Sequence, residues 1–118
     1  MAIASNAAFA LAPDLFRPFD SPVPVDLMGL DYLDFEAKLR ATAGDAVATA
    51  RVVAELQRAW TALRPQVVAA GATGASESFD AHVAAMKRLL ERGDAAALAA
   101  EAQHGLDLVD ELEQVFAA

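Results

Sequence analysis

GDAAALAAEAQHGLDLVDELEQVF, residues 93–116, carries the most regular helical pattern in the chain. Its apolar residues recur at steps of three and four, which places them on one face of a helix and leaves charged residues on the other. The apolar face is wider than the seam of a coiled coil, so the helix is expected to pack on several neighbours. Its members are Leu98, Ala102, Gly105, Leu106, Leu108, Val109, Leu112, Val115 and Phe116.

The Gly-Asp pair that opens this stretch also occurs earlier, at Gly44–Asp45. Glycine commonly ends a helix and aspartate commonly caps the next one, so each pair predicts a tight turn between two helices. The chain is therefore interpreted as two helical hairpins, 35–70 and 79–116, joined by a looser connection at 71–75. Two antiparallel hairpins predict an all-α fold, an up-down-up-down four-helix bundle spanning residues 30–118.

Local signals predict where the individual helices begin and end. The first is expected to begin near Asp31, which would act as its N-cap, and the third to be capped by Ser76 or Ser78. Pro65 predicts a kink or a helix end near residues 61–64, because proline removes a backbone donor and crowds the preceding turn. The side chains of the first helix that are expected to face the core are Tyr32, Phe35, Leu39 and Ala43.

The N-terminal segment, residues 1–29, differs in composition from the rest and is interpreted as an extended, proline-rich arm. It holds four of the five prolines, which prevent a continuous helix, together with the aromatic residues Phe9, Phe16 and Phe19. Such large apolar side chains are expected to be covered rather than solvated. The arm is predicted either to lie along its own bundle or to dock on another chain, including a second copy.

Composition excludes several classes of function. The chain has 118 residues, enough for one domain, and 9 basic against 17 acidic residues give a net charge of −8, which disfavours binding to nucleic acid. It has no cysteine, so disulfides and thiolate metal sites are excluded. No apolar stretch is long enough to cross a bilayer, and no catalytic motif is present, so a non-enzymatic protein is expected.

The cellular location stays open from the sequence. Residues 1–12 are apolar but lack a basic region, and Pro13 follows them, so an intact signal peptide is not expected. The protein is expected to be cytoplasmic, or extracytoplasmic in the envelope or periplasm if a signal peptide has already been removed.

The two histidines, His82 and His104, lie at similar distances on either side of the turn at 93–94. Antiparallel helices would bring them to the same level of the bundle, where facing helices often hold metals. A transition-metal or small-ligand site is therefore one hypothesis, with Met86 and Glu101 as further ligands and with Asp34 or Glu36 and Glu55 at the same level. The alternative is a half-exposed pair of histidines, since both border the apolar face and Glu-x-x-His occurs only once.

An acidic ridge formed by Asp107, Asp110 and Glu111, together with Gln114, follows His104 on the last helix. It is interpreted either as a solvated face or as a docking surface for a basic partner or a cation. Together with the aromatic arm, it makes a non-enzymatic interaction or scaffold module, acting through protein–protein contacts, the leading functional prediction. A metal- or small-ligand-binding bundle that uses His82 and His104 is the alternative.

Overall fold

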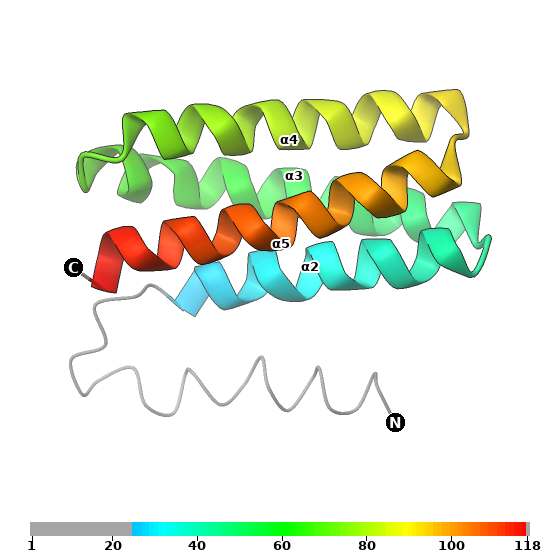
Figure 1. Ribbon diagram of the computed structural model, residues 1–118, viewed down its shortest axis with the longest axis horizontal. Helices are drawn as coiled ribbons and strands as arrows, with labels where there is room; N and C mark the ends of the chain where they lie inside the picture. Colours follow the sequence, from blue (N-terminus) through cyan, green and yellow to red (C-terminus); the bar gives the residue numbers. More distant parts are fainter. Residues whose placement is uncertain (1–24, 118) are drawn as a thin grey trace.

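The computed structural model describes residues 25–117, which form four α-helices packed side by side (Figure 1). These are α2 (Val25–Thr42), α3 (Ala46–Ala69), α4 (Thr73–Arg92) and α5 (Ala95–Ala117). Turns at 43–45, 70–72 and 93–94 join consecutive helices. The prediction of an all-α four-helix bundle is confirmed, whereas Phe9, Phe16 and Phe19 of the predicted arm lie outside the described residues. None of the four helices is long and apolar enough to cross a membrane.

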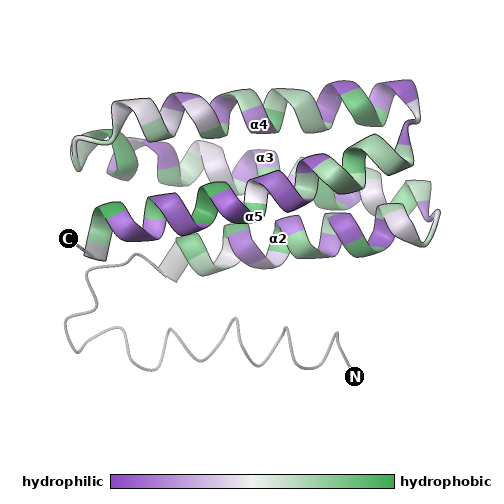
Figure 2. Cartoon of the chain, viewed as in Figure 1, coloured by the Kyte–Doolittle hydropathy of each residue, from purple (hydrophilic) through white to green (hydrophobic). Residues whose placement is uncertain are grey.

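The helices enclose one apolar core. Helix α2 packs on α3 and α5, and α4 packs on the same two helices from the opposite side. Along each helix, hydrophobic and hydrophilic positions alternate at helical spacing, so that each buries one face (Figure 2). The largest fully buried side chains include Leu27 and Leu30 of α2, Leu56 and Leu63 of α3, Phe79 and Met86 of α4, and Leu98 and Leu112 of α5.

Both predicted Gly-Asp turns are confirmed. Gly44 and Gly93 have φ angles of 76° and 69°, in the left-handed region that glycine adopts without steric cost. Asp45 Oδ1 accepts a hydrogen bond from the backbone N–H of Ala48 at 3.1 Å. Asp94 Oδ1 accepts the equivalent bond from Ala97 at 3.1 Å. Each aspartate therefore caps the helix that follows it, by the same local mechanism at two places in the chain.

Replacing the second cap, Asp94→Ala, should lower the free energy of unfolding by about 1 kcal/mol, because the first turn of α5 loses its side-chain acceptor. Urea unfolding measures this loss. Asp107→Ala is the matched control, since it removes the same charge from the same helix at an exposed position. Equal effects of the two substitutions would show that the loss comes from charge and that the cap contributes nothing.

Helix α2 begins at Val25, so the prediction of a start near Asp31 is wrong. Residues 25–29, which the sequence places in the arm, belong to the first helix. Asp31 lies inside the helix and does not cap it. The earlier start brings Leu27 and Leu30 into the core, where both are fully buried. This burial outweighs the cost of about 1 kcal/mol for Gly29 inside a helix.

The predicted inward face of α2 is also wrong. Tyr32 and Phe35 are only partly buried, and Leu39 is 37% exposed. Two apolar stripes run along α2 at helical spacing, and large side chains alone suggested the wrong one. The stripe that faces the core carries small alanines that allow close helix packing, and one buried acid whose partner lies on another helix. Its members are Leu27, Leu30, Asp34, Ala37 and Ala41.

The structure decides between the alternatives for α3 and corrects the start of α4. Helix α3 runs through Pro65 to Ala69, so it does not end near residues 61–64, and the alternative of a kink there stays a prediction. Pro65 is exposed, so water can reach the backbone carbonyl that loses its partner there. Helix α4 begins at Thr73 without a side-chain cap, and the hydroxyl of Ser76 instead donates to the carbonyl of Thr73 at 2.8 Å. The predicted caps Ser76 and Ser78 therefore lie within the helix.

Candidate functional site

A histidine and an aspartate meet in the middle of the apolar core. His82 of α4 places its Nε2 atom 2.8 Å from Oδ1 of Asp34 on α2. Both side chains are fully buried. Buried ionisable groups are strongly disfavoured unless they are paired, so each of these residues depends on the other for its place in the core.

A second carboxylate approaches the other side of the same imidazole ring. His82 Nδ1 lies 2.8 Å from Oε2 of Glu101 on α5. The side chain of Glu101 remains 22% exposed, whereas that of Asp34 has no contact with solvent. The three side chains, which we call the Asp34–His82–Glu101 network, connect α2, α4 and α5 and run from the core to the surface.

Gly105 of α5 provides the space for this network. A Cβ atom built on Gly105 would overlap Nε2 and Cε1 of His82 and Oδ2 of Asp34. No other residue type fits there without displacing the pair, because every other side chain carries a Cβ. The glycine therefore belongs to the network through its lack of a side chain.

The geometry of the network requires a bound proton. A neutral imidazole has one N–H group, yet both nitrogens of His82 face carboxylate oxygens at hydrogen-bonding distance. Burial raises the pKa of Asp34, and the hydrogen bond and charge of His82 oppose this effect only in part. Burial alone would lower the pKa of His82, but its bonds to Asp34 and Glu101 outweigh this and raise the pKa above the ordinary value. The raised pKa values of Asp34 and His82 both favour a network that keeps this proton.

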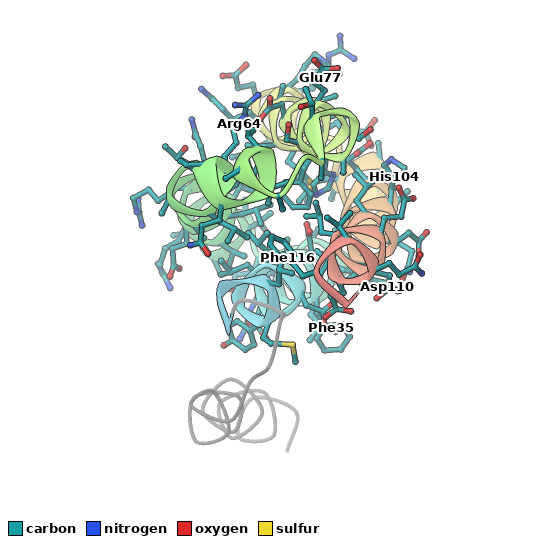
Figure 3. All side chains as sticks on the ribbon, turned by 90° about the vertical axis from the view of Figure 1, so that its left-hand side faces the viewer. Phe35, Arg64, Glu77, His104, Asp110 and Phe116 are labelled. Atoms are coloured by element: carbon teal, nitrogen blue, oxygen red, sulfur yellow. The ribbon has the colours of Figure 1, made fainter. Side chains whose placement is uncertain are left out.

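Aromatic rings close the network off from the α3 side. Phe79 packs edge-on against His82, with the ring centroids 5.1 Å apart, and Trp60 of α3 packs on Phe79 at 4.6 Å. The ring of His104 on α5 lies 6.3 Å from that of His82. His104 is exposed at the rim of the bundle (Figure 3).

The structure brings together only part of the predicted metal set. His82 does not border the apolar face but lies inside the core, which corrects the half-exposed interpretation, whereas His104 is exposed. Met86 is fully buried, and Glu101 is joined to His82. Within residues 25–117, no group of three or more histidines and acids is arranged to hold a metal ion. The transition-metal hypothesis stays a prediction.

A cluster between α3 and α4 was missed from the sequence. Asp80 accepts a hydrogen bond from Trp60 Nε1 at 2.7 Å and binds Arg64 through Nε and Nη2 at 3.0 and 2.8 Å. The bond to Arg64 lowers the pKa of Asp80. The sequence shows that Trp60 and Arg64 are four residues apart and therefore lie on one face of α3. It does not show which residue of α4 faces them, because this depends on how far α4 is shifted along α3. The hydrogen bonds of this cluster join α3 to α4.

The side of α2 that faces away from the core carries a row of large apolar residues, which we call the outer stripe. None of its side chains packs against the buried core. Phe35 lies at the rim of the bundle on the same side as Asp110, whereas Phe116 points towards the centre (Figure 3). The outer stripe consists of Met28, Tyr32, Phe35 and Leu39.

Acidic residues of α2 and α5 lie beside the outer stripe. Burial and the charge of Asp110 raise the pKa of Asp31, and burial followed by the charges of Asp110 and Asp31 raises that of Glu113. No described ion pair involves these three residues. Of the predicted acidic ridge, Asp110 joins this group, whereas Asp107 and Glu111 are exposed elsewhere on α5.

Comparison with known proteins gives no relative. No protein-family model, no curated protein and no solved structure matches the chain.

Proposed function

We propose that this chain is a non-enzymatic interaction module that binds a partner protein through the outer stripe of α2 and the adjacent acidic residues of α5. The observation that carries the proposal is the outer stripe itself, an apolar row that does not belong to the buried core. Leu39 is 37% exposed and the other three side chains of the stripe are partly exposed, and large apolar side chains that gather on an accessible face commonly mark a contact surface. A helix with one face in its own core and a second apolar face outside can serve two packing partners.

The chemistry of the partner follows from the charges beside the stripe. Asp31, Asp110 and Glu113 repel one another, so a cationic group placed among them would relieve that repulsion. A second copy of this chain, with a net charge of −8, would add to it. The best-suited partner is therefore an amphipathic segment that offers apolar side chains at helical spacing with lysine or arginine beside them.

The up-down-up-down order predicted from the sequence is part of this proposal. It is supported by the short turns at 43–45, 70–72 and 93–94 and by the packing of α2 on both α3 and α5. In that order, the N-terminus of α2 and the C-terminus of α5 belong to the same end of the bundle, where the acidic residues gather.

A synthetic peptide of leucine and lysine, with its leucines at helical spacing, serves as the probe for this surface. We expect it to bind the full chain, and we expect the double substitution Phe35→Ser, Leu39→Ser to weaken binding at least about tenfold. The melting temperature should change little, because neither side chain packs on the core. Fluorescence anisotropy of the labelled peptide measures the affinity, and added salt should reduce it.

Two controls distinguish specific docking from nonspecific binding. Val47→Ser changes an apolar residue that is 74% exposed on α3 and should leave binding unchanged. A peptide with glutamate in place of lysine should not bind. Equal binding of both peptides, or no effect of the Phe35 and Leu39 substitutions, would overturn the proposal. Light scattering on the free protein tests whether two copies associate through the same stripe. Such self-association would contradict the proposal of a basic, amphipathic partner.

A further inference from the structure

We infer that His82 is a proton-dependent link: while both ring nitrogens carry protons it joins α4 to α2 and to α5, and when one proton leaves, Glu101 moves into water while Asp34 stays bound. The inference concerns the interior of the bundle and does not depend on the proposed contact surface. It rests on the two hydrogen-bond distances, on the different exposure of the two carboxylates and on the space left by Gly105.

In the protonated state, the network is held by two charge-assisted hydrogen bonds. The imidazolium donates from Nε2 to Asp34 and from Nδ1 to Glu101, each at 2.8 Å. Two negative carboxylates and one positive ring leave a single net negative charge, and the more exposed carboxylate, that of Glu101, is the one that water can solvate. Every ring N–H therefore has an acceptor.

Loss of one proton makes this arrangement untenable. The ring then keeps one N–H, and its other nitrogen presents a lone pair to a carboxylate oxygen 2.8 Å away, so two acceptors face each other. One contact must break. Asp34 is enclosed on every side and cannot reach water, whereas Glu101 is already 22% exposed and can rotate outwards. The remaining proton therefore stays on Nε2, next to Asp34.

The other groups around the ring support this choice. From α2, Asp31 adds negative charge near Asp34, and this favours a proton on the Asp34 side. Of the titratable groups described on α5, Glu101 bonds to the ring and the ring of the exposed His104 lies 6.3 Å from it, whereas Phe79, and Trp60 behind it, present aromatic rings. The Asp34 side of the network is thus closed and the Glu101 side open.

Nitrogen-15 NMR of the full-length protein tests this inference through the protonation state of each ring nitrogen. We expect His82 to carry protons on both nitrogens at neutral pH and to become the Nε2–H tautomer when the pH is raised. The protection factors of the amides around residue 101, which are corrected for the intrinsic rise of exchange with pH, should then fall by roughly tenfold, as the loss of one charge-assisted hydrogen bond implies. Glu101→Gln should lower the pKa of His82, because it removes one of its two negative neighbours.

Two variants serve as controls in the same titration. Glu111→Gln removes the same charge at an exposed position of α5 and should leave the titration of His82 unchanged. His104→Gln removes the only other histidine and so assigns the remaining signals to His82. A single ring N–H at neutral pH would overturn the inference, as would a deprotonated ring that keeps its proton on Nδ1. An unchanged His82 titration in Glu101→Gln would also overturn it.

Discussion

Gly105→Ala should destabilise the bundle by about 3 kcal/mol or more, the combined effect expected of overpacking a core and disturbing a buried ion pair. The new methyl group would occupy the space of His82 Nε2 and Asp34 Oδ2. The pair would have to separate, or α5 would have to move away from α2 and α4. The usual gain of up to 1 kcal/mol for alanine over glycine inside a helix offsets only part of this cost.

Two other helical glycines provide matched controls for this measurement. A Cβ on Gly29 of α2 or on Gly74 of α4 would meet nothing within 4 Å. Gly29→Ala and Gly74→Ala should therefore raise the free energy of unfolding by about 0.4–1 kcal/mol, because alanine restricts the unfolded chain and favours the helix. Urea unfolding of the three variants gives the comparison. A stabilised Gly105→Ala protein would mean that the network does not occupy the place assigned to it.

His82→Leu should cost about 3–5 kcal/mol at neutral pH, since it leaves the buried carboxylate of Asp34 without its partner. The size of the side chain is nearly kept, so the loss reports the stranded charge rather than a cavity. The double variant Asp34→Leu, His82→Leu should recover most of the loss, because an apolar pair can replace a buried ion pair at little cost.

The pH dependence of the same variant gives an independent measurement. Burial already raises the pKa of Asp34, and without His82 it should rise further. A group whose pKa is raised in the folded state adds stability that is fully present below its unfolded pKa and is lost as pH rises through its folded pKa. The deficit of His82→Leu relative to the wild type should therefore shrink as the pH is lowered through the folded pKa of Asp34. Thermal melts that show a constant deficit would contradict a buried carboxylate as its cause.

Local signals made part of this fold predictable. The Gly-Asp turns and the apolar face of α5 depend only on residues close in the chain, and the structure confirms Gly44, Asp45, Gly93 and Asp94 in their predicted roles. The start of α2 was missed because Gly29 and the nearby prolines weaken the local helix signal, whereas burial of Leu27 by other helices decides the outcome.

The network was predictable only in outline. Counting from the turn at 93–94 brought His82 and His104 to one level, with Glu101 nearby and with Asp34 or Glu36 and Glu55 facing them, but it did not show that His104 is exposed and that Asp34 and Glu101 are the partners of His82. The rotation of each helix about its own axis decides which of these side chains point inwards, and it depends on contacts between helices. For the same reason, Gly105 was interpreted only as a member of an apolar face, although its role is to leave space for His82.

Two faces of α2 offer apolar side chains to a neighbouring helix, so hydrophobicity alone does not determine how this helix is rolled about its axis. Tyr32, Phe35 and Leu39 would bury more apolar area than the alanines that are actually inside. Asp34 can reach His82 in only one of the two rolled positions, so a polar contact in the core selects a single packing. The Asp34–His82 ion pair thus fixes the rotation of α2 about its own axis. Without it, as in His82→Leu, doubled amide signals from α2 would reveal a bundle that holds two arrangements.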